Sequence, residues 1–258
     1  MARSGNAEVK LPQPMRRPLV KMFLRSFLLQ ASWNFERLQN LGFLFLLLPG
    51  LRSIYGEDLS EEILERHREY FNTHPYFAPL VAGAILRLET SLAAGQETQV
   101  DVGEFKKMVM APLAAIGDSL FWGGIRPLAA IIALFLASRG SLWAPVAFLL
   151  LFNLPHLVCR GAGLVFGYFW GLRAIETIQR FRLPDVSVRC KEISIILLGV
   201  ICAYLAHKGC IHQELSPLWG LALLPVVLLF AHSARKGISS LFLILVTSAS
   251  LLGLALLF

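Results

Sequence analysis

The stretch MVMAPLAAIGDSLFWGGIRPLAAIIALFLAS, residues 108–138, decides the fold class. It is apolar and longer than the roughly 20 residues that cross a bilayer as a helix. Pro112, Asp118 and the Arg126–Pro127 pair nevertheless interrupt it. Because a charge inside a membrane segment is costly, such a residue marks a functional position by default. The stretch predicts a broken membrane helix with Asp118 and Arg126 as candidate functional residues.

The composition of the whole chain agrees with a membrane environment. Its 258 residues are 56% hydrophobic and only 16% charged, and its mean hydropathy is +0.62. A soluble domain usually carries about a quarter charged residues. The predicted fold class is therefore all-α: a polytopic integral membrane protein with discontinuous or re-entrant helices. One domain is predicted, because no Gly/Ser-rich linker divides the chain.

The positive charge is concentrated near the N-terminus. Six basic residues and one acidic residue, Glu8, lie in the first 25 residues, so these carry +5 of the net charge of +7. Basic residues beside the first membrane segment tend to stay in the cytoplasm, which predicts a cytoplasmic N-terminus. No basic stripe interleaved with aromatic residues follows, so a nucleic-acid partner is not predicted. The N-terminal stretch also lacks the small-residue cleavage site of a signal peptide.

The apolar runs and their interruptions divide the chain into segments. Residues 1–19 are predicted as a cytoplasmic arm and residues 20–258 as the membrane domain. Within that domain, residues 20–56 are expected to form an amphipathic interfacial helix over 20–37 and a re-entrant half-helix over 38–51. A charged cytoplasmic helix that starts near Asp58 is expected over 57–71, followed by broken membrane segments over 72–172 and a polar connection over 173–191. The C-terminal part, 192–258, is expected to form three spans over 193–206, 215–234 and 237–258.

Two groups of small residues carry structural expectations. Glycines at 161, 163, 167 and 171 resemble the small-xxx-small pattern that lets membrane helices approach closely. The four cysteines, Cys159, Cys190, Cys202 and Cys210, show no C-x-x-C spacing. They are interpreted as small buried apolar residues, so no metal site, disulfide framework or cofactor is predicted.

Three polar clusters stand among the apolar runs. They are SWNFER at 32–37 with Gln39–Asn40 behind it, FNTHP at 71–75, and GDSLFWG at 117–123 with Arg126–Pro127. Carboxylates and amides suit sugar hydroxyls, and an aromatic ring offers a flat surface to the C–H face of a pyranose. A few polar groups in an apolar cavity are typical of a small-molecule site. The clusters therefore favour a sugar ligand.

Structural interpretations of the same residues stay open. Glu36 and Arg37 could pair at the interface, and Asp118 with Arg126 could form a buried ion pair. His74 before Pro75 could bond the start of a helix, and Trp33 and Trp122 could be interface anchors. Arg160 and His156 could snorkel or pair locally.

The three clusters resemble the IID family of the mannose-type sugar phosphotransferase system (PTS). The strings that carry the resemblance are SWNFER at 32–37, FNTHP at 71–75, APLAAIGD at 111–118, FWG at 121–123, Arg126–Pro127 and FNL at 152–154. The resemblance runs in order from about residue 20 to the C-terminus, and it is specific through residue 170.

The resemblance implies a function. A IID chain pairs with a IIC membrane subunit in the bacterial cytoplasmic (inner) membrane, and the pair carries a hexose or amino sugar across it. Phosphoryl groups pass from phosphoenolpyruvate to IIA and IIB histidines, and IIB phosphorylates the sugar. IID carries no phosphorylated residue and is not an enzyme on its own. An oligomer of IIC–IID pairs in contact with membrane lipid is expected.

On this resemblance we expect sugar contacts from Asn34, Glu36 and Asn72, shared with IIC. Asp118, Trp122 and Arg126 would shape a discontinuous helix beside the substrate, and the helix at 57–71 would help dock IIB. Three features depart from the family pattern: Ser119 follows Asp118 where many relatives have Pro, the turn between 206 and 215 is short, and Pro155–His156 is unusual.

Two other function classes remain as alternatives. The chain could be a non-transporting assembly or regulatory membrane protein that keeps the IID fold. It could also be a membrane-embedded enzyme that uses His74 or Asp118. The sequence favours the enzyme least, because it contains no G-x-S-x-G, H-E-x-x-H, Walker-A or dinucleotide-binding motif.

Overall fold

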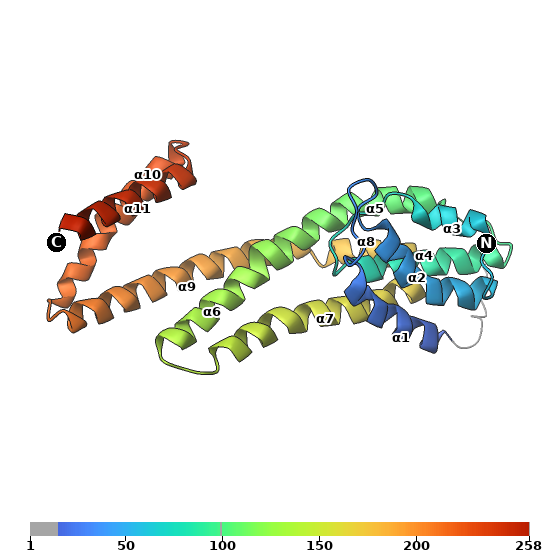
Figure 1. The fold of residues 1–258 in the computed structure, drawn as a ribbon, viewed down its shortest axis with the longest axis horizontal. Helices are drawn as coiled ribbons and strands as arrows, with labels where there is room; N and C mark the ends of the chain where they lie inside the picture. Colours follow the sequence, from blue (N-terminus) through green and yellow to red (C-terminus); the bar gives the residue numbers. More distant parts are fainter. Residues whose placement is uncertain (1–14, 99, 258) are drawn as a thin grey trace, which may run out of the picture. The chain divides into compact units, whose positions relative to one another are not determined.

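A computed structural model describes residues 15–98 and 100–257, and nearly all of its regular structure is helical (Figure 1). The chain forms two compact units, Met1–Leu197 and Leu198–Phe258. The first unit contains α1 (Arg16–Arg25), a 3₁₀ turn η1 (Ser26–Leu28), α2 (Asn40–Tyr55), α3 (Glu61–Arg68), α4 (Ala78–Ala93), α5 (Val102–Gly117), a π-helix η2 (Asp118–Ile125), α6 (Arg126–Ser138), α7 (Ala144–Trp170), α8 (Leu172–Arg180) and the start of α9 (Leu183–His212). The second contains the rest of α9, a 3₁₀ turn η3 (Pro217–Ala222), α10 (Leu223–Arg235) and α11 (Ser240–Leu257).

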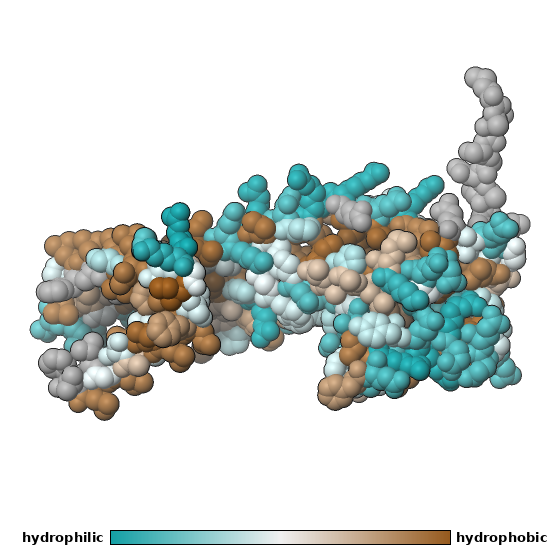
Figure 2. All heavy atoms as spheres, turned by 90° about the horizontal axis from the view of Figure 1, so that it is seen from above, coloured by the Kyte–Doolittle hydropathy of each residue, from teal (hydrophilic) through white to brown (hydrophobic). Residues whose placement is uncertain are grey.

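Three helical stretches of the described chain are long and apolar enough to cross a membrane: Val102–Ser138, Ala144–Trp170 and Leu172–His212. The first is the stretch that decided the fold class, and it runs without leaving the helical conformation from α5 through η2 to α6. The prediction of a polytopic all-α membrane protein is confirmed. Figure 2 shows hydrophilic side chains gathered at the end of the first unit that carries α3.

The core of the first unit lies where α4 packs on α7, and glycines make that contact possible. A Cβ atom on Gly167 would lie 2.2 Å from the Leu80 carbonyl oxygen, and one on Gly83 would lie 2.2 Å from the Leu164 carbonyl oxygen. The two backbones therefore touch directly, as small residues allow in membrane helix pairs. This confirms the close approach predicted from the glycine spacing in 161–171.

The helix predicted over residues 20–37 is wrong beyond its first turns. α1 starts earlier, at Arg16 inside the predicted arm, and ends at Arg25. Arg160 donates hydrogen bonds to the carbonyl of Ser26 at 2.6 Å and to its hydroxyl at 3.2 Å, and Ser26 is the first residue of the 3₁₀ turn that follows α1. Farther on, Asn34 and Leu38 form a small bridge, and Leu38 in turn bridges Phe71. These contacts use backbone groups that a helix would need.

Helix α2 continues past the predicted end at Pro49–Gly50 to Tyr55. Proline lacks an N–H, so the carbonyl of Phe45, four residues earlier, loses its helical partner. The Arg25 guanidinium donates to that carbonyl at 2.9 Å. The guanidinium also lies 4.2 Å from the centre of the Phe45 ring. A side chain from α1 thus replaces the missing hydrogen bond, and the proline is tolerated inside the helix.

The remaining elements differ from the sequence expectations mainly at their ends. The charged helix α3 is capped by Ser60, whose hydroxyl accepts from the Ile63 N–H at 3.5 Å, rather than by Asp58. The connection expected over 173–191 is helical, because α8 and the first turns of α9 occupy it. Leu215–Ala234 was expected as one span, but it divides into η3 and α10. The described apolar parts of α10 and α11 are shorter than the three stretches that are long enough to cross a membrane.

Candidate functional site

The segment Phe71–Phe77 links the three polar clusters. Gln39 and Thr73 exchange two hydrogen bonds: the Gln39 amide donates to the Thr73 carbonyl at 2.9 Å, and its oxygen accepts from the Thr73 N–H at 3.1 Å. The Thr73 hydroxyl donates to the Met110 carbonyl at 3.1 Å. Gln39 and Met110, far apart in the chain, therefore both contact the short segment at Thr73, as residues of one shared site must.

His74 lies at the centre of this meeting point, and Gly117 makes room for it. A Cβ atom on Gly117 would lie 2.2 Å from His74 Cγ, so the imidazole packs directly on the α5 backbone. The His74 carbonyl accepts from Phe77 and Ala78, and its Nδ1 accepts from the Tyr76 N–H at 3.3 Å. The interpretation of His74 as a residue that bonds the start of a helix is confirmed.

The imidazole also faces a carboxylate. His74 Nε2 lies 4.0 Å from Asp118 Oδ1, and the two side chains are 0% and 64% exposed. Asp118 is therefore open to its surroundings in this chain, and the expectation of a buried Asp118–Arg126 ion pair is wrong. The described hydrogen bonds give His74 Nε2 no partner. An open carboxylate beside a buried imidazole can bind a hydroxyl group.

Asp118, Trp122 and Arg126 follow one another at intervals of four residues, and we call them the polar stripe. Trp122 is 39% exposed, and its ring centre lies 5.3 Å from the ring centre of His74. The Arg126 guanidinium lies 5.8 Å from the centre of the Trp122 ring. Asp118 and Trp122 belong to the π-helix η2, and Arg126 starts α6. π-helical turns are rare and frequently accompany functional sites.

Aromatic rings and two further polar residues surround the stripe. Tyr76 lies 4.8 Å from Phe121 and 4.3 Å from His156, measured between ring centres. His156 pairs locally, with Nε2 2.9 Å from Asn153 Oδ1, as one interpretation expected. Arg160 does neither of the things expected of it: it is buried, and it bonds Ser26 across 134 residues of sequence. The stripe is therefore backed by a packed, largely aromatic wall.

No pattern in the sequence predicts the contact between η2 and α9. The Ser187 hydroxyl donates to the Ser119 carbonyl at 2.7 Å, and Lys191 Nζ donates to the Ser119 hydroxyl at 3.3 Å. Gly123 and Gly124 lie under Lys191 and Cys190. Ser119, noted as a departure from the family pattern, thus anchors α9. An isolated serine pair 68 residues apart carries no pattern that sequence reasoning could detect.

The other predicted site residues are not members of the stripe, and the structure gives them contacts of their own. The Asn34 amide is used within its loop, donating to Asn40 Oδ1 at 2.9 Å and accepting from the Arg37 N–H at 2.7 Å. The Glu36 carboxylate is 83% exposed and pairs with Arg37 at 3.7 Å, which confirms that structural interpretation. Asn72 precedes Thr73 in the linking segment, and its N–H contacts the Met110 sulfur at 3.3 Å.

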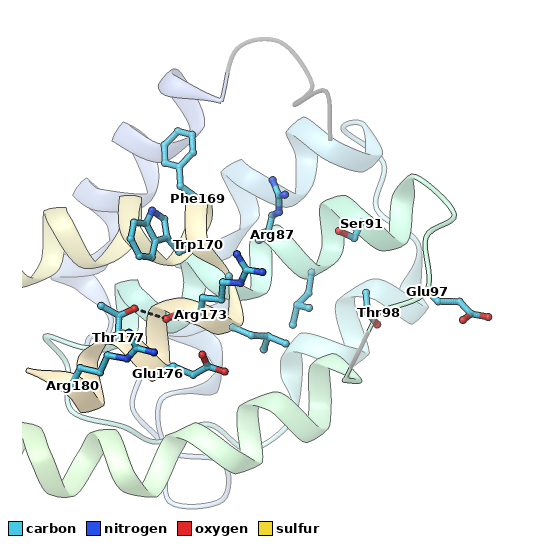
Figure 3. A pocket seen from close by; sticks show the side chains of 13 residues that line it. Arg87, Ser91, Glu97, Thr98, Phe169, Trp170, Arg173, Glu176, Thr177 and Arg180 are labelled. Atoms are coloured by element: carbon cyan, nitrogen blue, oxygen red, sulfur yellow. Dashed lines mark hydrogen bonds between the residues drawn. The ribbon is translucent and has the colours of Figure 1, made fainter. Parts of the chain in front are cut away.

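Glu36 belongs to a surface hollow of about 680 Å³ beside α3. The hollow is lined by Glu36, Arg37, Glu62, Glu65, Arg66, Glu69 and Tyr70. A separate hollow of about 790 Å³ lies beside α8. In Figure 3 Arg87 and Ser91 on α4 line one side of it, and Arg173, Glu176, Thr177 and Arg180 on α8 line the other. Neither hollow contains the polar stripe.

The family of the chain follows from its sequence over nearly its whole length. Residues 15–257 match the family described as PTS system mannose/fructose/sorbose family IID component. The chain belongs to this family. It is 37% identical to the mannose-specific EIID component of Escherichia coli (strain K12) over 191 residues, which cover 72% of this chain and 67% of that protein. The fructose permease IID component of Bacillus subtilis (strain 168) is 30% identical over 72% of this chain and 68% of its own length. The sorbose-specific EIID component of Klebsiella pneumoniae is 33% identical over 71% of this chain and 68% of its own length.

Solved structures share the fold of this IID component. One chain described as a membrane protein aligns with a TM-score of 0.71 at 30% identity, covering 93% of this chain and 95% of its own. Another, from the mannose transporter ManYZ in complex with microcin E492, aligns with a TM-score of 0.58 at 29% identity, covering 95% and 97%. The resemblance drawn from the three polar clusters is therefore confirmed, and the chain is a IID component of a mannose-family PTS permease.

Proposed function

We propose that this IID component, paired with a IIC membrane subunit, carries a hexose or amino sugar across the bacterial cytoplasmic membrane. The sugar would be phosphorylated on arrival by IIB, which receives its phosphoryl group through IIA. The mannose, fructose and sorbose names of the relatives and the ManYZ likeness support this assignment. In this scheme the chain itself holds no phosphorylated residue, and its N-terminus lies in the cytoplasm.

The polar stripe is the observation that carries the proposal. Charged side chains at membrane depth almost always face a bundle interior or a water-filled cavity. Asp118 and Arg126 are exposed on the long apolar stretch Val102–Ser138. In the proposal, IIC covers this face, and the sugar lies in the cavity between the two subunits. The exposed Trp122 ring would stack on the sugar, and the Asp118 carboxylate would accept hydrogen bonds from the sugar hydroxyl groups.

The residues of the first two clusters receive different parts in the same proposal. Asn72 lies two residues from His74, so its side chain is a candidate sugar contact beside the stripe. Asn34 and Glu36 remain predicted sugar contacts, to be shared with IIC. The internal hydrogen bonds of Asn34 support a positioning role for the loop at 34–38. The charged hollow beside α3 is proposed as part of the IIB docking surface.

The test is sugar uptake driven by phosphoenolpyruvate in vesicles that hold the chain, its IIC partner and the soluble carriers. Labelled mannose is tried first, and other hexoses and amino sugars follow. Asp118→Asn is expected to abolish accumulation of sugar phosphate while the membrane complex stays intact. The matched control is Glu104→Gln, an exposed carboxylate near the start of the same helical stretch, which is expected to leave uptake within twofold.

Glu36→Gln and omission of the partner separate the alternatives. If Glu36 contacts sugar, its variant loses uptake although the complex still forms. If the variant loses complex formation instead, the loop serves assembly. No uptake of any sugar by an intact complex would contradict transport and favour the assembly or regulatory alternative. Sugar turnover by the chain without any partner would contradict both and favour the enzyme.

A further inference from the structure

A small hollow between α1 and α2 gathers basic side chains. Its volume is about 270 Å³. It is lined by Arg17, Pro18, Lys21, Arg25, Pro49, Arg52, Ser53 and Glu57. α1 lies beside α2 in Figure 1, and α1 contributes three of the four cations. Arg17, Lys21 and Arg25 follow one another at intervals of four residues, so they lie on one face of the helix.

The charges of this basic hollow are not balanced within it. Four cations face one carboxylate, Glu57, so the lining carries a charge of +3. Arg52 pairs with Glu57 at 3.5 Å, but both side chains are exposed, and such pairs contribute little. Like charges at intervals of four residues destabilise a helix. An anion in the hollow would relieve this repulsion, which the described residues of the lining leave in place.

Arg25 gives the hollow a fixed wall. Its guanidinium is held by the Phe45 carbonyl that Pro49 leaves without a helical donor, and it lies against the Phe45 ring. Among the described residues Arg17 and Lys21 have no ion pair or side-chain hydrogen bond. They are therefore available to a ligand, and a phosphate group suits basic side chains that converge on a small space.

The surface beside the basic hollow is apolar. Val20, Leu24 and Phe27 are exposed large hydrophobic residues on the neighbouring face of α1 and the turn after it. A cationic stripe next to an apolar stripe is the pattern of a helix that lies at a membrane interface. A soluble phosphate compound would contact the basic side chains and leave the apolar ones uncovered. A phospholipid would contact the basic side chains with its phosphate and the apolar ones with its acyl chains.

We propose that the basic hollow binds the phosphate of an anionic phospholipid headgroup, with the acyl chains lying along Val20, Leu24 and Phe27. The lipid would hold α1 at the membrane surface and, through Arg25, support the Pro49 position of α2. Basic pockets beside membrane helices bind anionic headgroups in this manner. The inference does not depend on the proposed sugar transport.

The experiment measures lipid retention by the full chain purified with its co-purifying membrane partner. The complex is reconstituted with phosphatidylcholine and phosphatidylglycerol, returned to detergent, and the bound lipid is counted by native mass spectrometry. We expect selective retention of phosphatidylglycerol by the natural chain. The variant Arg17→Gln/Lys21→Gln/Arg52→Gln is expected to lose at least tenfold of it.

Two controls match this variant. Arg87→Gln/Arg173→Gln/Arg180→Gln removes the same charge from the hollow beside α8, whose lining also contains Glu97 and Glu176, and should keep the lipid. Arg17→Lys/Arg52→Lys keeps the charge, should retain the lipid within threefold, and distinguishes loss of charge from a damaged helix. Equal retention by both triple-glutamine variants would overturn the proposal.

Two further outcomes identify other ligands. If millimolar inorganic phosphate displaces phosphatidylglycerol completely and binds without it, the hollow is a soluble-phosphate site and the lipid proposal fails. If the Arg17→Gln/Lys21→Gln/Arg52→Gln variant keeps its lipid but no longer binds the soluble phosphocarrier proteins, the hollow is a protein docking surface, and the lipid proposal fails as well.

Discussion

The Glu89–His67 pair and the Asp118–His74 pair are both contacts between a carboxylate and a histidine. Both side chains of the Glu89–His67 pair are buried, whereas Asp118 is exposed. Glu89 and His67 are both fully buried, with Glu89 Oε1 3.1 Å from His67 Nε2. Arg66 donates to the same carboxylate at 3.1 Å, and the Tyr55 hydroxyl donates at 2.7 Å. Around Asp118 there is one buried imidazole at 4.0 Å, and the carboxylate itself is exposed.

The chain satisfies the Glu89 charge with its own side chains, whereas it leaves the Asp118 charge exposed. The Glu89 group fastens α3 to α4 and α2, and it has enough donors to offset the cost of burying a charge. Lys106 adds to it from α5, donating to the Arg66 carbonyl and lying 3.3 Å from Glu69. Among the described residues Asp118 has no such set of donors, and its carboxylate stays exposed. The two groups should therefore respond differently to the same changes.

The largest expected effect is on stability at the enclosed pair. Glu89→Ala leaves the buried His67 and the partly exposed Arg66 without their carboxylate, and we expect a loss of about 3–5 kcal/mol in the free energy of unfolding. Asp118→Ala should cost less than about 1 kcal/mol, because an exposed carboxylate keeps its hydration in the separated chain. Thermal unfolding in detergent measures both. Equal losses would remove the distinction between the two pairs.

A change at Gly117 tests whether His74 must lie beside Asp118. Gly117→Ala places a Cβ atom 2.2 Å from the imidazole, which must move, at a cost of about 1–3 kcal/mol for overpacking. Sugar uptake should fall at least tenfold even at temperatures where the protein stays folded. Gly123→Ala is the control, because its Cβ would come closest to the end of the flexible Lys191 side chain, at 3.2 Å, and would lie at an ordinary 3.7 Å from the Asp118 carbonyl oxygen. Undiminished uptake by Gly117→Ala would show that the His74 position does not matter.

The buried Glu89–His67 pair should also make the free energy of unfolding depend on pH. Burial lowers the pKa of His67, which lies on α3 outside the long apolar stretches, although the hydrogen bond to Glu89 opposes the shift. No described residue bonds its buried Nδ1, so protonation would bury an unpaired N–H. The unfolded chain takes up the proton first, and stability falls as the pH drops below about 6.5, by up to about 1.4 kcal/mol per unit.

His67→Gln should reduce this dependence, since glutamine keeps a donor for Glu89 and does not titrate. The measurement is the unfolding midpoint of both proteins between pH 5 and pH 8. Parallel curves would mean that another group causes the acid sensitivity.

The smallest effect is expected at Trp122, which lies beside the exposed Asp118–His74 pair. Trp122→Phe keeps a ring against His74 but reduces the stacking surface, whereas Trp122→Ala removes it. Aromatic contacts contribute about 0.5–1.5 kcal/mol, so the alanine variant should weaken the apparent sugar affinity about 2- to 12-fold and the phenylalanine variant less. Saturation curves of uptake decide this. An unchanged affinity in Trp122→Ala would leave Trp122 as an interface anchor, the structural interpretation that its sequence position also allowed.

Much of the fold and the family could be predicted from the sequence, because their signals are local. The apolar stretch at 108–138 and the low charge predicted membrane helices, and the glycines at 161–171 predicted a close helix contact. The strings at 32–37, 71–75 and 111–118 indicated the IID family. The helix predicted over residues 20–37 is wrong because the chain makes other backbone hydrogen bonds. Asn34 and Leu38 exchange two of them, the Gln39 N–H donates to the Phe71 carbonyl, and the Phe71 N–H donates to the Arg37 carbonyl.

Composition and the spacing of residues within a few positions are enough to predict that this chain is helical, enters a membrane and carries polar clusters in apolar surroundings. The tertiary structure decided which polar groups are closed and which are open. Arg160 finds Ser26 across 134 residues, Arg25 satisfies the carbonyl left by Pro49, and Ser187 holds the π-helical turn at Ser119. Such pairs depend on where separate helices meet, so only the packed chain shows that Glu89 is enclosed whereas Asp118 is exposed.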